Sequence, residues 1–131
     1  MKRLSRTERA SIAQALDVRE AQLREEIRAE LLQSSDQKYV DLAGSVHDLS
    51  DESVANELVD IENALIERHL HELREIEFAR KRLADGTINR CRVCGAEIAF
   101  ERLLVLPTAV RCVVCEGLRE KTYAHEATPR L

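Results

Sequence analysis

The sequence predicts a mainly α-helical fold in which a long antiparallel coiled-coil hairpin is followed by a small cysteine-rich module and a short C-terminal helix. Three observations lead to this prediction. Charged residues make up 34% of the chain and aromatic residues only 3%, without any Trp, a composition typical of long helices with a thin core. Apolar residues recur at intervals of three and four residues in two separate stretches. Four cysteines gather in the last third of the chain.

The first helix is expected to begin near Ser5, because Ser5 followed by Glu8 has the spacing of a capping box. An apolar stripe then continues for about 26 residues, roughly 39 Å at 1.5 Å per residue. It consists of Ile12, Leu16, Leu23, Ile27 and Leu31. The stretch Ser34-Ser35-Asp36 weakens the pattern and Gly44 marks a loop, so the first helix should end before this stretch.

A second helix is expected to end at Asp85-Gly86 and to be capped at its start by Ser50 or Asp51. Val59, Ile66 and Leu70 lie off its main stripe and could meet the start of the first helix or a partner. The stripe itself consists of Val54, Leu58, Ile61, Leu65, Leu73, Ile76 and Leu83. Because neither helix can bury its stripe alone, the two should pair antiparallel. Across this interface we expect contacts among Leu23, Ile27, Leu58, Ile61 and Leu65.

The four cysteines form two Cys-x2-Cys pairs separated by seventeen residues, at Cys91, Cys94, Cys112 and Cys115. Such spacing lets four thiolates surround one structural Zn²⁺ in a closed tetrahedral site. Two disulfides are the competing interpretation, but the chain starts Met-Lys-Arg-Leu without an apolar signal region, which favours a reducing compartment. The finger needs its metal because roughly thirty residues bury too little apolar surface alone.

The predicted organisation is an antiparallel coiled coil over residues 1–86, with an acidic tip loop near 35–50, and a C4 zinc finger plus C-terminal helix over 87–131. A net charge of −4 argues against a general nucleic-acid binder. Seven acids and one base lie between Asp36 and Asp60, so the expected tip is strongly acidic. With no 18-residue apolar run, the protein is expected to be cytoplasmic, and we expect a monomer.

The other candidate groups are given ordinary structural roles. His69 and His71 would point about 200° apart on a helix, so they form no metal pair. His47 and His125 are expected to be solvated, and the run Arg80-Lys81-Arg82 is interpreted as a solvated face. No nucleophile context is present, so no enzymatic activity is predicted.

The finger resembles that of the DksA/TraR transcription regulators. The resemblance rests on Cys91-x2-Cys94-Gly95, Ile98, Arg102-Leu103, Pro107-Thr108 and Cys112-x2-Cys115. The joint Asp85-Gly86-Thr87 is also similar, although Ile88 and Asn89 replace the usual aromatic residue and Gly. Asn is the residue that best replaces Gly at positive φ, so the turn is expected to survive.

Members of this family insert a coiled-coil tip into the secondary channel of bacterial RNA polymerase, toward the catalytic Mg²⁺. Their tip carries an Asp-x-x-Asp-x-Ala motif that alters open-complex stability. The segment Asp48-Leu49-Ser50-Asp51-Glu52-Ser53 is similar, with Ser53 in place of Ala. The resemblance therefore implies a zinc-containing regulator that binds RNA polymerase, with Asp48, Asp51 and Ser53 as partner-binding residues.

Some members also bind guanosine tetraphosphate between protein and polymerase through basic side chains. The matching positions here are Glu75, Leu106 and Glu116, and two acids and a Leu cannot hold a polyphosphate. Either this chain works without the nucleotide or it binds polymerase in another setting. Competing functions are a zinc-finger adaptor for another protein, a thiol-based redox or zinc sensor, and DNA binding through the few arginines that flank the finger.

Overall fold

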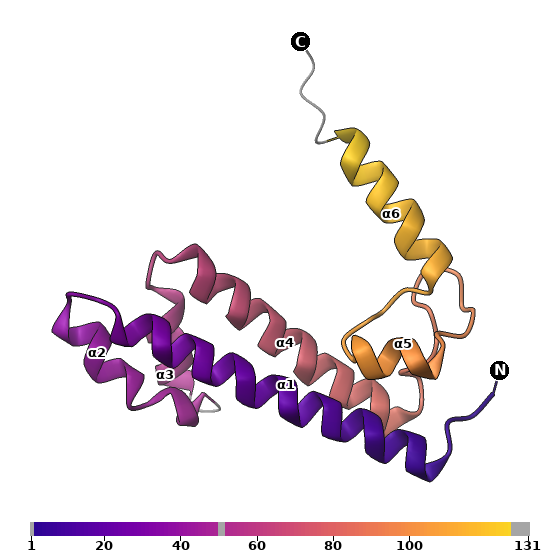
Figure 1. The fold of residues 1–131 in the computed structure, drawn as a ribbon, viewed down its shortest axis with the longest axis horizontal. Helices are drawn as coiled ribbons and strands as arrows, with labels where there is room; N and C mark the ends of the chain where they lie inside the picture. The colour runs from indigo at the N-terminus through magenta and orange to yellow at the C-terminus, as the bar shows by residue number, and fades with distance from the viewer. Residues whose placement is uncertain (1, 50–51, 127–131) are drawn as a thin grey trace. The chain divides into compact units, whose positions relative to one another are not determined.

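The computed structural model describes residues 2–49 and 52–126 and is helical throughout most of them (Figure 1). The chain divides into two compact units, one made of residues 1–15 and 78–131 and the other of residues 16–77. The helices are α1 (Arg6–Leu32), α2 (Gln37–Ala43), the 3₁₀ turn η1 (Val46–Asp48), α3 (Glu52–Val59), α4 (Ala64–Asp85), α5 (Phe100–Val105) and α6 (Val113–Glu126). None of these described helices is long and apolar enough to cross a membrane.

Helix α1 begins with the predicted capping box. The backbone N–H of Ser5 donates to Glu8 Oε1 at 2.9 Å, and the N–H of Glu8 donates to Ser5 Oγ at 3.0 Å. These reciprocal bonds satisfy two amides that the helix itself leaves unpaired. The 27-residue helix confirms the expected length.

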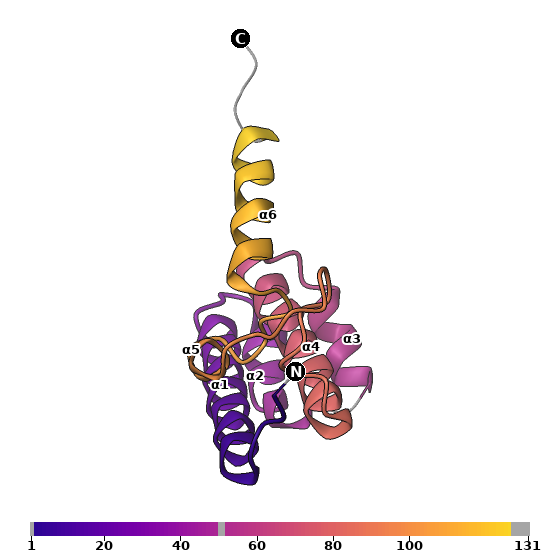
Figure 2. The same ribbon diagram turned by 90° about the vertical axis from the view of Figure 1, so that its right-hand side faces the viewer.

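In the unit of residues 16–77, α1 and α4 pack antiparallel, as predicted (Figures 1 and 2). Three polar pairs join α1 to α4 or to the residue that precedes it. The residue number on the α4 side falls as the number in α1 rises, as antiparallel packing requires. The pairs are Arg19 with Glu72 at 2.9 Å, Glu26 with His69 at 3.4 Å, and Glu30 with Asn63 at 3.3 Å. The His69 contact gives that side chain a structural role in the helix pair.

The second helix of the hairpin is interrupted between Val59 and Ala64, where one continuous helix was predicted. Asn63 caps the new start, since its Oδ1 accepts the N–H of Leu65 at 3.0 Å and of Ile66 at 3.1 Å.

The break changes which face of α4 is buried. Ile66 and Leu70 are buried, whereas Leu65 is 39% exposed and Val59 is 52% exposed. The predicted interface contact of Leu65 is therefore wrong, because the stripe was followed across a break that resets the helix phase. The other four residues of that prediction, which are Leu23, Ile27, Leu58 and Ile61, are buried.

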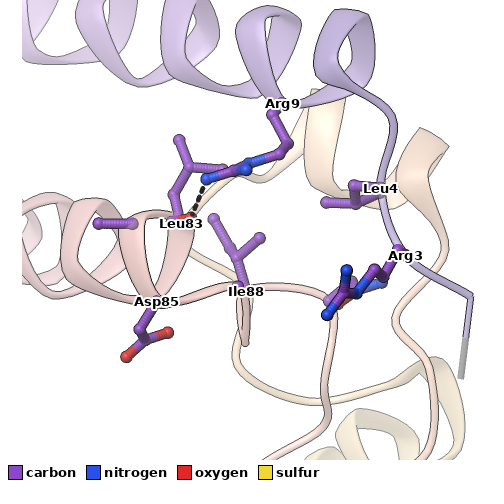
Figure 3. Close-up of a pocket in the computed structure, with 9 residues that line it drawn as sticks. Arg3, Leu4, Arg9, Leu83, Asp85 and Ile88 are labelled. Carbon is purple, nitrogen blue, oxygen red and sulfur yellow. Dashed lines mark hydrogen bonds between the residues drawn. The ribbon is translucent and has the colours of Figure 1, made fainter.

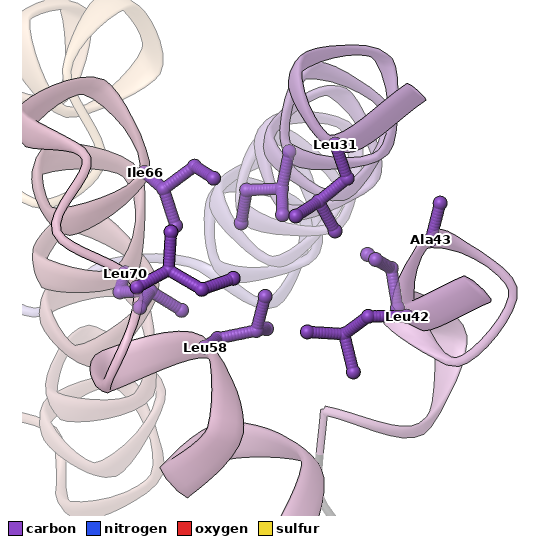
Figure 4. Packing of buried hydrophobic residues seen from close by; sticks show 9 residues of the cluster. Leu31, Leu42, Ala43, Leu58, Ile66 and Leu70 are labelled. Atoms are coloured by element: carbon purple, nitrogen blue, oxygen red, sulfur yellow. The ribbon is translucent and has the colours of Figure 1, made fainter. Parts of the chain in front are cut away.

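The segment between α1 and α3 holds α2 and η1, where the sequence suggested an irregular loop. Asp36 caps α2 by accepting the N–H of Lys38 at 2.9 Å. The side chains of Leu42, Ala43 and Val46 are then buried in a small core, shown in Figure 4. This tip core consists of Ile27, Leu31, Leu42, Ala43, Val46, Leu58, Ile61, Ile66 and Leu70. The expected caps of α3, Ser50 and Asp51, lie outside the described residues.

In the unit of residues 1–15 and 78–131, α4 ends as the sequence predicts. Gly86 adopts φ +82°, a left-handed conformation that costs Gly least. The N–H of Thr87 donates to the carbonyl of Arg82 at 2.9 Å, and that of Gly86 donates to the carbonyl of Leu83 at 3.4 Å. This pair of bonds is a Schellman motif, which ends the helix and turns the chain toward the cysteines.

Candidate metal centre

The four cysteine sulfurs lie within 4.8 Å of one another. The Sγ atoms of Cys94 and Cys112 are 3.7 Å apart, and all four cysteines are free. A disulfide would need about 2.05 Å, whereas sulfurs at the corners of a tetrahedron around Zn²⁺ lie about 3.8 Å apart for Zn–S bonds of about 2.3 Å. The cluster therefore has the separation of a zinc site.

The first knuckle is a tight turn closed by backbone hydrogen bonds. Gly95 adopts φ +77°, and its N–H donates to the carbonyl of Cys91 at 3.0 Å. The N–H of Cys91 donates to the carbonyl of Ala96 at 2.7 Å, and that of Val93 lies 3.4 Å from the Cys91 sulfur. An antiparallel bridge between Arg90 and Glu97 closes the turn. The local backbone thus aims the sulfurs of this knuckle at one point.

The second knuckle lies at the start of α6, which begins at Val113. Cys112 precedes the helix and its carbonyl accepts the N–H of Glu116 at 2.9 Å. Cys115 follows in the first turn of the helix. A backbone bond from Arg92 to the carbonyl of Val110, at 2.9 Å, joins the two knuckles.

The electrostatics of the cluster suit a dication. Burial raises the pKa of Cys91, but backbone N–H donors from Cys94, Cys112 and Val93 prevail and lower it to about 6. Hydrogen bonds with the Cys94 and Cys112 side chains raise the pKa of Cys115 to about 12. Four sulfurs this close cannot all be thiolates unless a cation balances them. The donor set therefore fits one structural Zn²⁺, with no position left for water or substrate.

Arg82 holds the joint between α4 and the finger. Only 5% of this residue is exposed, and its guanidinium donates to the carbonyls of Thr87 at 3.0 Å, Ala109 at 3.4 Å and Arg90. Burial, and then the charge of Arg92, lower its pKa from the usual value. The prediction of a solvated face is wrong at this position. A charge run gives no signal of burial, because the acceptors come from residues 5 to 27 positions later in the chain.

Asn89 does not replace Gly at positive φ, because among the described residues only glycines have positive φ. It is 4% exposed, and its Nδ2 donates to the carbonyl of Lys2 at 2.9 Å. Its own carbonyl accepts the N–H of Ile98 at 2.7 Å. Asn89 thus anchors the N-terminal segment to the finger, a role that sequence spacing could not reveal.

The residues expected to bind a partner are only partly described. Asp48 closes η1, with 61% of its side chain exposed and His47 Nε2 3.2 Å from its Oδ2. Ser53 lies in the first turn of α3 with an exposed side chain. Asp51 lies outside the described residues.

The surroundings of the three positions matched to nucleotide-binding residues do not favour a polyphosphate. Glu75 lies 3.8 Å from His71, Leu106 is 47% exposed, and Glu116 contacts Arg111 at 3.7 Å. Nothing at these positions supplies a cation of its own to a polyphosphate.

Residues 85–121 match the family described as the prokaryotic dksA/traR C4-type zinc finger. YteA of Bacillus subtilis is 54% identical over 43 residues, covering 30% of this chain and 18% of YteA. The RNA polymerase-binding transcription factor DksA of Escherichia coli K12 is 29% identical over 99 residues, covering 76% of this chain and 62% of DksA. The match therefore spans less than two thirds of either relative.

The fold is similar to that of the transcription factor DksA2 from Pseudomonas aeruginosa. The TM-score is 0.58 at 26% identity, covering 92% of this chain and 89% of DksA2. The helical arrangement is thus shared with a known transcription factor. The segment that holds the C4 zinc site at Cys91, Cys94, Cys112 and Cys115 is thus a DksA/TraR C4-type zinc finger.

Proposed function

We propose that the protein is a non-enzymatic transcription regulator that binds bacterial RNA polymerase and modulates initiation. The observation that carries this proposal is the 29% identity, over 76% of the chain, to DksA of Escherichia coli K12, which is an RNA polymerase-binding transcription factor. The zinc centre is a scaffold in this function, since a closed four-sulfur site leaves no open coordination position.

The effector part is the tip of the unit formed by residues 16–77. Its apolar side chains pack into the tip core, while its acids face solvent. Between residues 36 and 60, the exposed acids among the described residues are Asp36, Asp41, Asp48, Glu52, Glu57 and Asp60. A folded element that presents carboxylates suits entry into the secondary channel, where cationic groups and the catalytic Mg²⁺ would attract them.

We assign the main effect on initiation to Asp48 and Asp51, together with Ser53, the residues of the motif found in the sequence. The fit of acids to a cationic site is electrostatic, so charge should matter more than shape. Guanosine tetraphosphate has no part in this proposal, because Glu75 and Glu116 would repel it.

Co-purification of the zinc-loaded full chain with core RNA polymerase tests the proposal. We expect binding by the native protein and by Asp48→Asn, with a reduced effect of the variant on initiation in vitro. Glu67→Gln, which removes the same charge from an exposed site in the first turn of α4, outside these acids, is the matched control and should keep both properties. Absence of any complex with core polymerase would overturn the proposed function.

A further inference from the structure

A cavity of about 340 Å³ lies in the unit of residues 1–15 and 78–131 (Figure 3). The N-terminal segment, the start of α1, the end of α4 and the joint after it border this cavity, which is open to solvent on one side. Leu4, Leu83 and Ile88 line its apolar part. The volume is at the lower end of the range of roughly 300–1,000 Å³ found for small-molecule sites. The cavity is separate from the cysteine cluster, none of whose residues lines it.

Two arginines, Arg3 and Arg9, give this cavity its charge. Within residues 2–49 and 52–126, neither forms an ion pair with a carboxylate. Arg9 donates one N–H to the carbonyl of Leu83 at 3.1 Å. A guanidinium has five N–H donors in a planar fork, so most of the Arg9 donors and those of Arg3 stay available to a ligand.

The carboxylate at the cavity does not neutralise these arginines. Asp85 Oδ1 accepts the N–H of Thr87 at 3.1 Å and the Thr87 hydroxyl at 2.5 Å. Figure 3 shows its side chain directed away from both Arg3 and Arg9. The cavity thus presents two positive charges beside an apolar lining.

The carbonyl end of α4 would ordinarily disfavour an anion here, since it carries partial negative charge. In this structure the last carbonyls already have donors. That of Arg82 accepts from Thr87, and that of Leu83 accepts from both Gly86 and Arg9. The opposing helix dipole is therefore partly offset at the cavity.

We propose that this cavity binds a small organic phosphomonoester, with its phosphate on Arg3 and Arg9 and its apolar body against Leu4, Leu83 and Ile88. A phosphomonoester carries a charge of about −1.5 to −2 at neutral pH, which matches two guanidinium groups. A monocarboxylate would leave one of the two positive charges unbalanced. Planar guanidinium forks also fit the spacing of phosphate oxygens. The apolar lining favours an organic body over the free ion.

Phenyl phosphate, inorganic phosphate and phenol are suitable probes, added separately to the zinc-loaded full chain at low ionic strength. Amide chemical shifts should follow the binding. Phenyl phosphate should produce saturable shifts at Leu4, Ala84 and Ile88, which line the cavity. Inorganic phosphate should bind at least about threefold more weakly, because it contacts none of the apolar lining. Phenol should produce no saturable shift.

Arg3→Gln separates this site from general charge attraction. The variant should bind phenyl phosphate about tenfold more weakly, the loss expected for a charge-assisted hydrogen bond. Arg6→Gln is the matched control, because it removes the same charge from the first turn of α1, and Arg6 does not line the cavity. It should bind as the native protein does.

Three results would each overturn the proposal. The first is shifts that do not saturate, and the second is equal weakening in the Arg3 and Arg6 variants. The third is equal affinity for phenyl and inorganic phosphate, since the apolar lining would then have no part in binding. The readout does not involve polymerase, so failure here leaves the proposed transcriptional function untouched.

Discussion

The side-chain amide of Asn89 lies 2.9 Å from the carbonyl oxygen of Lys2, and the two residues are 87 positions apart in the chain. Asn89 is 4% exposed, so the donor side of this hydrogen bond is buried, whereas Lys2 is an exposed residue. It connects the segment before α1 to the strand-like backbone that enters the first cysteine knuckle. The N-terminal residues therefore contribute to the stability of the finger.

Asn89→Ala should lower the free energy of unfolding by about 0.5–1.5 kcal/mol, because one partly buried hydrogen bond is lost. Asn89→Gly should destabilise the protein to a similar extent or more, since no positive φ has to be accommodated at this position. Urea unfolding of the zinc-loaded protein measures both. Deleting residues 1–3 should remove most of the stability difference between the native protein and the Asn89→Ala variant, whereas an undiminished difference would contradict the assigned hydrogen bond.

Cys112→Ser should abolish tight zinc binding and loosen residues 88–117, because folding of such a module depends on its metal. The helices of the unit formed by residues 16–77 should keep their amide protection, since their core contains none of the cysteines. Elemental analysis should find one Zn²⁺ per native chain, and hydrogen exchange should map the loosened region. Loss of protection throughout α2 and α3 would contradict this independence.

Leu58→Ala should cost about 2–5 kcal/mol of unfolding free energy, because the side chain is fully buried in the tip core. Figure 4 shows it between Leu42 and Leu70. The neighbouring Val59 is 52% exposed and offers a control, since Val59→Ala should change stability by no more than about 0.5 kcal/mol. Similar losses in the two variants, measured by urea unfolding, would show that this core is not formed in solution.

Glu72 should make stability depend on pH. The hydrogen bond from Arg19 lowers the Glu72 pKa, against the opposing effect of burial. A carboxylate with a lowered folded-state pKa contributes stability above its unfolded pKa of about 4.3, and this contribution is lost as pH falls through the folded value.

Glu72→Gln should therefore flatten the decline of stability below about pH 5. The effect should be small, because 28% of the Glu72 side chain and 34% of the Arg19 side chain are exposed to screening solvent. Urea unfolding at several pH values is the measurement, with Glu77→Gln, an exposed acid of the same helix, as control. An unchanged slope in Glu72→Gln would refute this linkage.

Asp51 allows a capping role to be separated from an effector role. Asp51→Asn should keep near-normal stability, because Asn caps a helix about as well as Asp, whereas Asp51→Ala should lose about 0.5–2 kcal/mol if the residue is a cap. If Asp51 acts as an effector, the Asn variant should lose activity as the Ala variant does, since both substitutions remove the charge. We expect Asp51→Asn to bind polymerase yet lose most of its effect on initiation in vitro. Full activity of the Asn variant, with loss in the Ala variant, would favour the capping role alone.

The parts of the fold that follow from short-range rules could be predicted from the sequence. The Ser5–Glu8 box, the stop at Gly86 and the cysteine spacing each depend on neighbours within a few residues, or on a metal whose geometry is fixed. The confirmed antiparallel pairing follows from two stripes that each need a partner.

Long-range packing accounts for the wrong predictions at Arg82 and Asn89. The burial of Arg82 depends on carbonyls of the finger, and that of Asn89 on the N-terminal segment. The break before α4 did leave a local signal, because Asn63 followed by Ala64-Leu65-Ile66 is a capped helix start. The α2 segment likewise has a local signal, because Asp36 is a suitable helix cap. Its apolar residues, however, are too few to predict a helix without the tip core.

Apart from Asp36, which caps α2, the described residues of the tip divide into one set that forms its core and another that gives its charge. Leu42, Val46 and Leu58 hold it together, whereas Asp48 and its acidic neighbours take no part in that core. Substitutions on the outer surface of the tip should thus change its stability little. Related proteins could therefore differ in the charge pattern of this surface while the core stays the same. A tip of this kind is suited to diverge in what it recognises while its core is inherited intact.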